Sequence, residues 1–276
     1  MTTASHALIS GGSSGIGLAL ARRLAAQGWN ISVLARNEEK LAAARREIEA
    51  LRRDPAQRIV TLSADMRDEA AVNRAVATAM AELGTPALLV ASAGIVEPGM
   101  FVDTPVEAHR RNMDVNYFGA LYLVRAALPA MRKTQGGRIV LISSGAAFIG
   151  IYGYSSYAPS KFALRGLGEV LRAELAPEGI GVSVVYPPDT ETPMLKEEIP
   201  LRPPALAKIA AGSAVLSADR VADSILLGIA RKRASIAPGL EMAALARLHS
   251  LIGPLINRFW FDRVVARWHG RPPQAS

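Results

Sequence analysis

The chain has 276 residues, of which 50% are hydrophobic and 20% are charged, and its formal net charge is +8. This length allows a single α/β domain with a full hydrophobic core. The absence of cysteine excludes disulfide bonds and thiolate catalysis. The first five residues lack the basic and then apolar pattern of a signal peptide, so we expect a cytoplasmic location, with peripheral contact to the inner face of a membrane as a further option.

Short apolar runs alternate with helical patterns along the chain. Runs of this kind are typical of strands buried on both faces, and their alternation with helices indicates a parallel, doubly wound α/β sheet of the Rossmann type. One intervening helix is predicted from the apolar stripe Leu41, Ala44, Ile48 and Leu51. The predicted strands contain residues 7–9, 31–34, 59–62, 88–90, 139–142 and 182–185.

We interpret the chain as one domain with three parts. Residues 1–193 form the dinucleotide-binding and catalytic core, 194–239 a helical lid and the following helix, and 240–276 a basic amphipathic extension. The lid itself, 194–216, is where we expect substrate specificity to reside. Ser217 is predicted to cap the next helix, whose apolar face consists of Val221, Ile225, Leu226 and Ile229.

A glycine-rich turn follows the first predicted strand. The strand His6 to Ser10 leads into Gly11–Gly17 and then into an Ala/Leu-rich helical stretch that ends at Gly28. This arrangement directs backbone N–H groups and a helix N-terminus toward a pyrophosphate, and glycines let the backbone approach it closely. The alternative is a tight αβ connection without a ligand.

Tyr157 and Lys161 are four residues apart and would share one face of a helix. A nearby ammonium favours the phenolate, so we expect Lys161 to lower the pKa of Tyr157. Ser144 follows the predicted strand 138–142 and could donate a hydrogen bond to a carbonyl oxygen. The alternative for the Tyr-x-x-x-Lys pair alone is a surface aromatic beside a solvated amine.

Together these motifs resemble the short-chain dehydrogenase/reductase family over residues 5–195. The family's Thr-Gly-x-x-x-Gly-x-Gly motif is matched by residues 10–17, with Ser10 in place of Thr. The resemblance implies catalytic roles for Asn116, Ser144, Tyr157 and Lys161, with the backbone of Asn116 holding a water next to the lysine. It implies cofactor contacts from Gly11, Ser13, Ser14, Gly15, Ile16, Gly17, Asp65, Met66, Ala93, Gly94, Pro187, Thr190 and Thr192, together with Tyr157 and Lys161.

The sequence departs from the family pattern in two places. The usual Asn-Asn-Ala-Gly is Ala91-Ser92-Ala93-Gly94, and Pro188 replaces the glycine of the Pro-Gly-x-x-x-Thr segment. Proline fixes φ and removes an N–H, so we expect a stiffer loop.

The end of the second predicted strand indicates which dinucleotide binds. A carboxylate there suits the ribose 2′-OH of NAD, whereas a 2′-phosphate requires a cation. The segment Ala35-Arg36-Asn37 has no carboxylate, and the guanidinium of Arg36 suits a phosphate. We therefore predict NADPH as the cofactor, the alternative being that Arg36 is a solvated loop residue.

Most of the excess positive charge lies in the last quarter of the chain. From residue 201 onward there are eleven basic residues and only four acidic ones. Within 240–276, leucines and aromatic residues alternate with arginines, a composition typical of a segment that contacts anionic lipid. Packing against another subunit of a dimer or tetramer explains it equally well. We expect no nucleic-acid partner, because no recognition motif accompanies the charge.

The segment 186–193, Tyr-Pro-Pro-Asp-Thr-Glu-Thr-Pro, is similar to that of 3-ketosphinganine reductases within the family. This resemblance implies NADPH-dependent reduction of a long-chain amino ketone in sphingolipid synthesis. Asp189 and Glu191 are candidate acceptors for the substrate ammonium, although Asp189 could instead cap a turn. The alternatives are reduction of a fatty ketone, steroid or ketoacyl thioester, or a non-catalytic nucleotide-binding scaffold. No metal is expected in the site.

Overall fold

The protein is described by a computed structural model over residues 4–134 and 136–268. Its centre is a seven-stranded sheet in the order β3-β2-β1-β4-β5-β6-β9, with every neighbouring pair parallel. The six predicted strands are confirmed, whereas β9 was not predicted because two residues carry no periodic signal. The strands are β1 (His6–Ser10), β2 (Asn30–Ala35), β3 (Ile59–Ser63), β4 (Leu88–Ala91), β5 (Arg138–Ile142), β6 (Gly181–Val185) and β9 (Ser235–Ile236).

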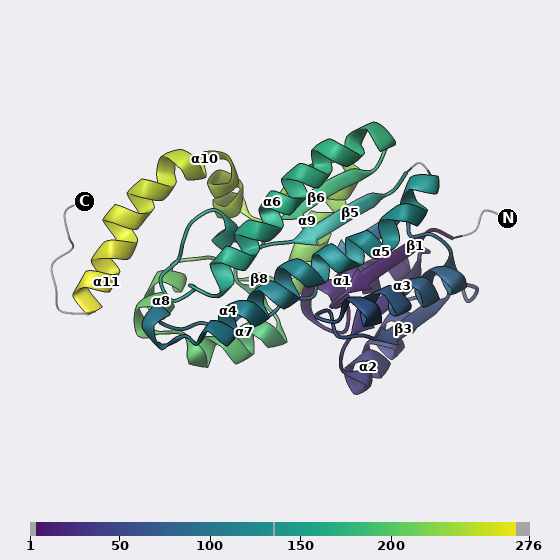
Figure 1. Ribbon diagram of the computed structural model, residues 1–276, viewed down its shortest axis with the longest axis horizontal. Coiled ribbons are helices and arrows are strands. Elements are labelled where there is room, and N and C mark those ends of the chain that lie inside the picture. The colour runs from purple at the N-terminus through teal and green to yellow at the C-terminus, as the bar shows by residue number, and fades with distance from the viewer. Residues whose placement is uncertain (1–3, 135, 269–276) are drawn as a thin grey trace.

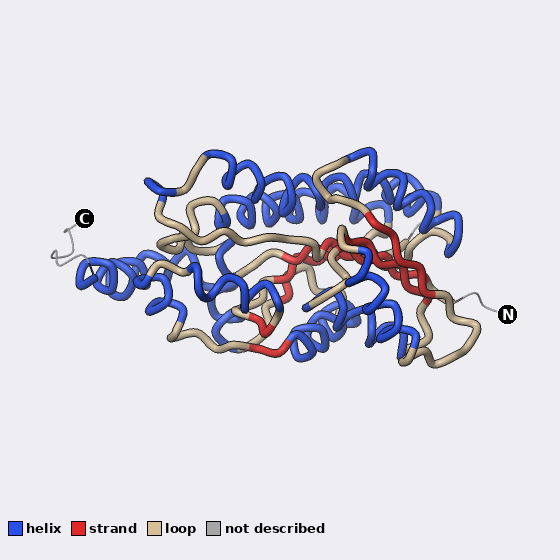
Figure 2. Tube along the Cα trace, turned by 90° about the horizontal axis from the view of Figure 1, so that it is seen from below, coloured by secondary structure: helices blue, strands red, loops and turns tan. Residues whose placement is uncertain are grey.

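Helices cover both faces of the sheet, so the strands lie between two helical layers (Figure 2). One hydrophobic core lies under α1 (Gly15–Ala26), α2 (Glu38–Glu49) and α9 (Ala218–Ala230). The other lies under α3 (Glu69–Leu83), α5 (Gly119–Lys133) and α6 (Tyr157–Leu175), with α4 (Val106–Met113) beside α6. The doubly wound α/β fold is thereby confirmed.

The predicted stripe of α2 is correct in three of its four positions. Leu41, Ala44 and Ile48 are buried, but α2 ends at Glu49. Leu51 lies beyond the helix, where the 3.6-residue period no longer orients it toward the sheet, and it is 41% exposed.

The chain order reverses next to β1, which pairs with β2 on one side and β4 on the other. At such a switch point the connections leave the sheet in opposite directions and open a crevice at the carboxyl ends of the strands. The glycine turn after β1 and the loop after β4 therefore meet there. Gly11 is close enough to this loop that a Cβ on it would lie 2.6 Å from the backbone nitrogen of Ala93.

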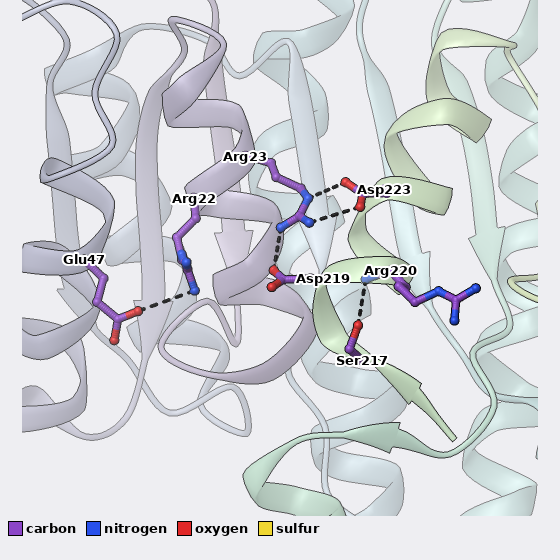
Figure 3. A network of polar contacts seen from close by, with 7 residues as sticks. All are labelled: Arg22, Arg23, Glu47, Ser217, Asp219, Arg220 and Asp223. Carbon is purple, nitrogen blue, oxygen red and sulfur yellow. Dashed lines mark hydrogen bonds and ion pairs between the residues drawn. The ribbon is translucent and has the colours of Figure 1, made fainter. Parts of the chain in front are cut away.

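Helix α9 begins as predicted, with the Ser217 hydroxyl accepting a hydrogen bond from the backbone N–H of Arg220. Val221 and Ile225 are buried against α1. Arg23 of α1 reaches between Asp219 and Asp223 of α9 (Figure 3). These ion pairs connect the helix after the glycine turn to the helix after the lid.

The residues between β6 and α9 form a helical layer over the carboxyl edge of the sheet. Helices α7 (Pro193–Glu198) and α8 (Pro204–Ala210) lie between the two short strands β7 (Thr190–Glu191) and β8 (Leu216–Ser217). These strands pair in parallel. The lid residues therefore leave and rejoin the core at one point.

The C-terminal part of the chain forms α10 (Leu240–Ile256), a π-helical turn over Asn257–Phe261, and α11 (Asp262–Trp268). These helices extend along one end of the molecule, and α11 contacts α8 (Figure 1). Residues 269–276 of the predicted extension lie outside the described residues. None of the helices within residues 4–268 is long and apolar enough to cross a bilayer.

Candidate active site

A cavity of about 950 Å³ opens at the carboxyl edge of the sheet. It runs from the glycine turn, past the Tyr157 side chain, to the lid and α10. Three predicted site residues, Gly17, Asn116 and Glu191, are not among the lining residues. The predicted residues that line it are Gly11, Ser13, Ser14, Gly15, Ile16, Arg36, Asp65, Met66, Ala93, Gly94, Ser144, Tyr157, Lys161, Pro187, Asp189, Thr190 and Thr192.

The glycines of the turn have distinct structural roles. Gly11 and Gly15 have φ of +68° and +54°, which side chains disfavour. A Cβ on Gly15 would lie 2.9 Å from the Thr192 methyl carbon, so this glycine leaves room between turn and lid. Gly17 was predicted to contact the cofactor directly, but it does not line the cavity. A Cβ on Gly17 would lie 2.5 Å from the Gly11 carbonyl oxygen. Its role is to pack α1 against the turn.

The N-terminus of α1 faces the cavity without a side-chain cap from Ser14. The first N–H groups of a helix have no partner within the helix, and the helix dipole favours an anion there. A pyrophosphate fits this position because the glycines provide close approach and the helix provides donors.

Two cations line the cavity at the end of β2. Arg36 follows the strand, and Lys40 lies in the first turn of α2, where the Asn37 side chain accepts a hydrogen bond from the Lys40 backbone N–H at 2.7 Å. Lys40 was not among the predicted cofactor residues. Its position could have been inferred, because side chains of a first helical turn lean toward the N-terminus.

Asp65 also lines this end of the cavity, together with Met66. Its carboxylate accepts hydrogen bonds from Arg67, with Nη2 at 2.6 Å, and these hold the pKa of Asp65 below its ordinary value. The carboxylate that was predicted to contact the adenine is thus already ion-paired with Arg67.

Ser144 and Tyr157 come from different elements and meet in the cavity. Ser144 follows β5, and its hydroxyl accepts a hydrogen bond from the Ala146 N–H at 3.2 Å, which fixes its position. Tyr157 is the first residue of α6 and hydrogen-bonds Ser144. Two hydroxyl groups therefore face the same point from a strand end and a helix start.

Lys161 lies one turn further along α6, with its Nζ 5.6 Å from the centre of the Tyr157 ring. It donates a hydrogen bond to the Ile142 carbonyl oxygen at 3.1 Å, and burial lowers its pKa to about 8. The expected lowering of the Tyr157 pKa is wrong for this arrangement. Burial raises that pKa, and the Ser144 hydrogen bond offsets it only in part. Tyr157 is therefore protonated near neutral pH, as a proton donor must be.

Asn116 is buried behind the cavity in a π-helical turn, Asp114–Phe118. Its side chain exchanges two hydrogen bonds with the backbone of Ile95, at 2.8 and 3.0 Å, and donates a third to Ser160 at 2.8 Å. A Cβ on Gly94 would lie 3.1 Å from the Asn116 Oδ1 and 3.5 Å from the Lys161 Nζ. Asn116 thus holds the β4 loop next to the lysine, and a π-turn is a frequent feature of functional sites.

The loop after β6 closes over Ser144. The Pro187 carbonyl oxygen accepts a hydrogen bond from the Gly145 N–H at 3.1 Å. The Thr190 hydroxyl donates to the Pro188 carbonyl oxygen at 2.9 Å, and the Thr192 hydroxyl caps α7. Both threonines therefore line the cavity in fixed orientations.

The two acidic residues of this loop have different positions. Asp189 lines the cavity and forms an ion pair with Arg202 at 2.8 Å instead of capping a turn. Glu191 is exposed on β7 and lies outside the cavity lining, which contradicts its predicted substrate role. Its strand neighbour Thr190 lines the cavity, and adjacent strand residues point to opposite faces, so the Glu191 side chain points away from the site.

The far end of the cavity is largely apolar. A Cβ on Gly145 would lie 2.8 Å from the Met242 sulfur, so Met242 packs directly against this glycine. A Cβ on Gly212 would likewise lie 2.6 Å from the Trp260 ring. The sequence did not reveal that the C-terminal segment forms a wall of the site. Apolar lining residues from the lid and C-terminal segment are Met194, Leu195, Leu201, Leu206, Ile209, Leu245, Ile252, Ile256, Trp260 and Phe261.

Comparison with known families agrees with this geometry. Residues 5–201 match the short chain dehydrogenase family. The chain belongs to this family. It is therefore an oxidoreductase of the short-chain dehydrogenase/reductase type, and the family implies a nicotinamide dinucleotide as cofactor. The open α1 N-terminus and the glycines without room for a Cβ fit such a group.

The curated relatives are similar over most of the chain. The chain is 38% identical to the 3-dehydrosphinganine reductase of Danio rerio over 222 aligned residues. The aligned region covers 80% of this chain and 67% of the relative. It is 34% identical to the 3-ketodihydrosphingosine reductase of Dictyostelium discoideum, over 93% of this chain and 80% of the relative. Among solved structures, levodione reductase has 25% identity and a TM-score of 0.79, covering 87% of this chain and 98% of that one.

Proposed function

We propose that the protein reduces a long-chain ketone with NADPH, and that the ketone is 3-ketosphinganine. The observation that carries this proposal is a single cavity in which Ser144 and Tyr157 adjoin an apolar compartment made by the lid and α10. Such a compartment suits a hydrocarbon chain, because burial of each methylene contributes about 0.8 kcal/mol. The named activities of the relatives point to the same substrate class.

In this mechanism a bound NADPH supplies the hydride. Ser144 hydrogen-bonds the ketone oxygen and Tyr157 donates a proton to it, so the negative charge that develops on oxygen is neutralised. Lys161 holds the nicotinamide ribose, and Asn116 anchors the water that resupplies the proton. The raised pKa of Tyr157 keeps the acid loaded before reaction.

The preference for NADPH is supported by the two cations at the end of β2. Arg36 and Lys40 both line the cavity beside the adenosine end of the predicted dinucleotide site. A 2′-phosphate there would accept charge-assisted hydrogen bonds, whereas a 2′-OH would gain little from two cations.

We also propose that the C-terminal segment contacts anionic lipid. On α10, Ile252 and Ile256 line the cavity, while Leu251 and Leu255 on another face are 71% and 52% exposed. This exposed face continues at Phe259, which is 52% exposed and flanked by Arg258 and Arg263. Apolar side chains beside exposed arginines favour an anionic membrane surface over another apolar protein face.

The decisive experiment is NADPH oxidation by the purified protein with 3-ketosphinganine in detergent. We expect turnover that exceeds turnover of a steroid ketone and of a ketoacyl thioester of similar size. A higher kcat/KM for either of these would replace the substrate while leaving the oxidoreductase assignment intact. Cofactor binding without turnover of any ketone would support a nucleotide-binding scaffold instead.

A further inference from the structure

A buried polar network lies beside Tyr157 and is not used by the mechanism above. The Tyr154 hydroxyl donates a hydrogen bond to Glu198, and Glu198 accepts a second one from Arg202 at 2.6 Å. Arg202 also pairs with Asp189 at 2.8 Å. The side chains of Arg202 and Glu198 are only 5% and 8% exposed.

The network faces the reaction centre. Tyr154, Asp189 and Glu198 all line the cavity. The rings of Tyr154 and Tyr157 are 5.3 Å apart, in one cluster with the apolar side chains of Ile151 and Leu206. A substrate group one bond away from the reacting carbonyl carbon would therefore lie within reach of this network.

The charges of the network do not balance. Two carboxylates share one guanidinium, which leaves one net negative charge in an apolar surrounding. A buried charge without compensation is costly, so a cationic ligand group would be favoured there. Burial is the largest cause of the raised pKa of Tyr157, and the negative charges of Glu198 and Asp189 raise it further. The two carboxylates are therefore close enough to Tyr157 to interact with it electrostatically.

The network also has an unused donor. Arg202 binds its two carboxylates through Nε and Nη1, whereas its buried Nη2 has no hydrogen-bond partner within the described residues. Buried donors are rarely left unpaired, so this nitrogen indicates a missing acceptor. Arg202 itself does not line the cavity, so its role in the network is to orient the two carboxylates that do.

We propose that Asp189 and Glu198, oriented by Arg202, form a subsite that binds the ammonium of a 2-amino-3-ketone beside Tyr157. This inference rests on the proposed function and specifies how that substrate class is recognised. The apolar compartment takes the chain, and the subsite distinguishes an amino ketone from a plain ketone. Asp189 is thus a ligand for the ammonium only as part of an ion-paired network, which the sequence did not predict.

A structural role for the same residues would have a different signature. Glu198 and Arg202 belong to the lid, and Asp189 belongs to the loop after β6, so the network also connects these two segments. If that were its only role, loss of a carboxylate would impair every ketone alike. Ammonium recognition instead predicts a loss confined to the amino ketone.

The test compares two ketones of equal chain length, 3-ketosphinganine and the 1-hydroxy-3-ketone that lacks the amine. The kcat/KM ratio of the two is measured for the wild type, Asp189→Asn and Glu198→Gln. We expect the wild type to prefer the amino ketone and each variant to reduce that preference about 10- to 100-fold, as for loss of a charged hydrogen bond. Glu191→Gln is the matched control, since it removes an exposed carboxylate of the same loop and should preserve the ratio.

Thermal melts identify a variant that fails to fold. If Glu198→Gln does not fold, Asp189→Asn provides the test, because the Asp189 side chain is 26% exposed and tolerates substitution better than the 8% exposed side chain of Glu198. An unchanged ratio in folded variants overturns the subsite but leaves the proposed function standing. A wild type that reduces only the amine-free ketone also overturns the subsite. A wild type that reduces neither ketone overturns the proposed function together with the subsite.

Discussion

The cofactor end of the cavity contains a glycine turn with a fixed backbone shape, whereas the substrate end is formed by side chains of later segments. At the cofactor end, Gly11 and Gly15 leave space where any Cβ would collide. At the substrate end, lid residues such as Leu206 and C-terminal residues such as Ile252 and Phe261 form the wall. Backbone geometry restricts residue type strongly and leaves a motif, whereas an apolar wall accepts many side chains and leaves none.

The largest effect is expected where the two ends meet. Tyr157→Phe removes the proton donor, so ketone reduction should fall by about 10²- to 10⁴-fold, while NADPH affinity stays close to that of the wild type. Steady-state turnover and a fluorescence titration with NADPH measure the two quantities. Tyr152→Phe is the control, because it makes the same change outside the cavity lining. Retained turnover in Tyr157→Phe would remove this residue from the mechanism.

Cofactor choice tests the cofactor end alone. The double variant Arg36→Ala/Lys40→Ala should lose about 10- to 100-fold in kcat/KM for NADPH and much less for NADH, because only the 2′-phosphate contacts disappear. The kinetics are measured with both dinucleotides at one saturating ketone concentration. Arg45→Ala is the matched control on α2, where Arg45 pairs with Glu49. Equal losses with NADPH and NADH would contradict the assignment.

The outer face of the substrate end is tested by vesicle binding. Leu251→Glu/Leu255→Glu changes exposed leucines, so binding to phosphatidylglycerol vesicles should weaken by about tenfold or more. Turnover of a detergent-solubilised ketone should change little, since neither residue lines the cavity. Cosedimentation measures the binding, and Val170→Glu on α6 controls for added charge at an exposed aliphatic position. Unchanged binding would leave subunit contact as the explanation for the exposed leucines.

The smallest effect concerns the connection between the two ends. Arg23→Ala removes the contacts between α1 and α9 seen in Figure 3. The carboxylates of Asp219 and Asp223 are more than half exposed, so the free energy of unfolding should fall by only about 0.2–1 kcal/mol. Urea unfolding measures this change, with Arg132→Ala as a comparison at another surface ion pair. A loss above about 3 kcal/mol would show that the two ends depend on this contact.

The sequence by itself determined six of the seven strands, the glycine turn and the Ser144, Tyr157 and Lys161 constellation, because these depend on local periodicity and short spacings. It did not determine the protonation of Tyr157. Its pKa depends on burial and on the charges of Asp189 and Glu198, which lie far from it in the chain.

Only the tertiary structure decided how the substrate end is made. It brought Glu198 and Arg202 of the lid to Asp189 and excluded Glu191, and it folded α10 over the cavity. Such contacts join segments without a fixed spacing. The physical reason is that side-chain packing between distant segments is specified by the whole fold, whereas hydrogen-bonded turns and helix faces are specified by neighbouring residues.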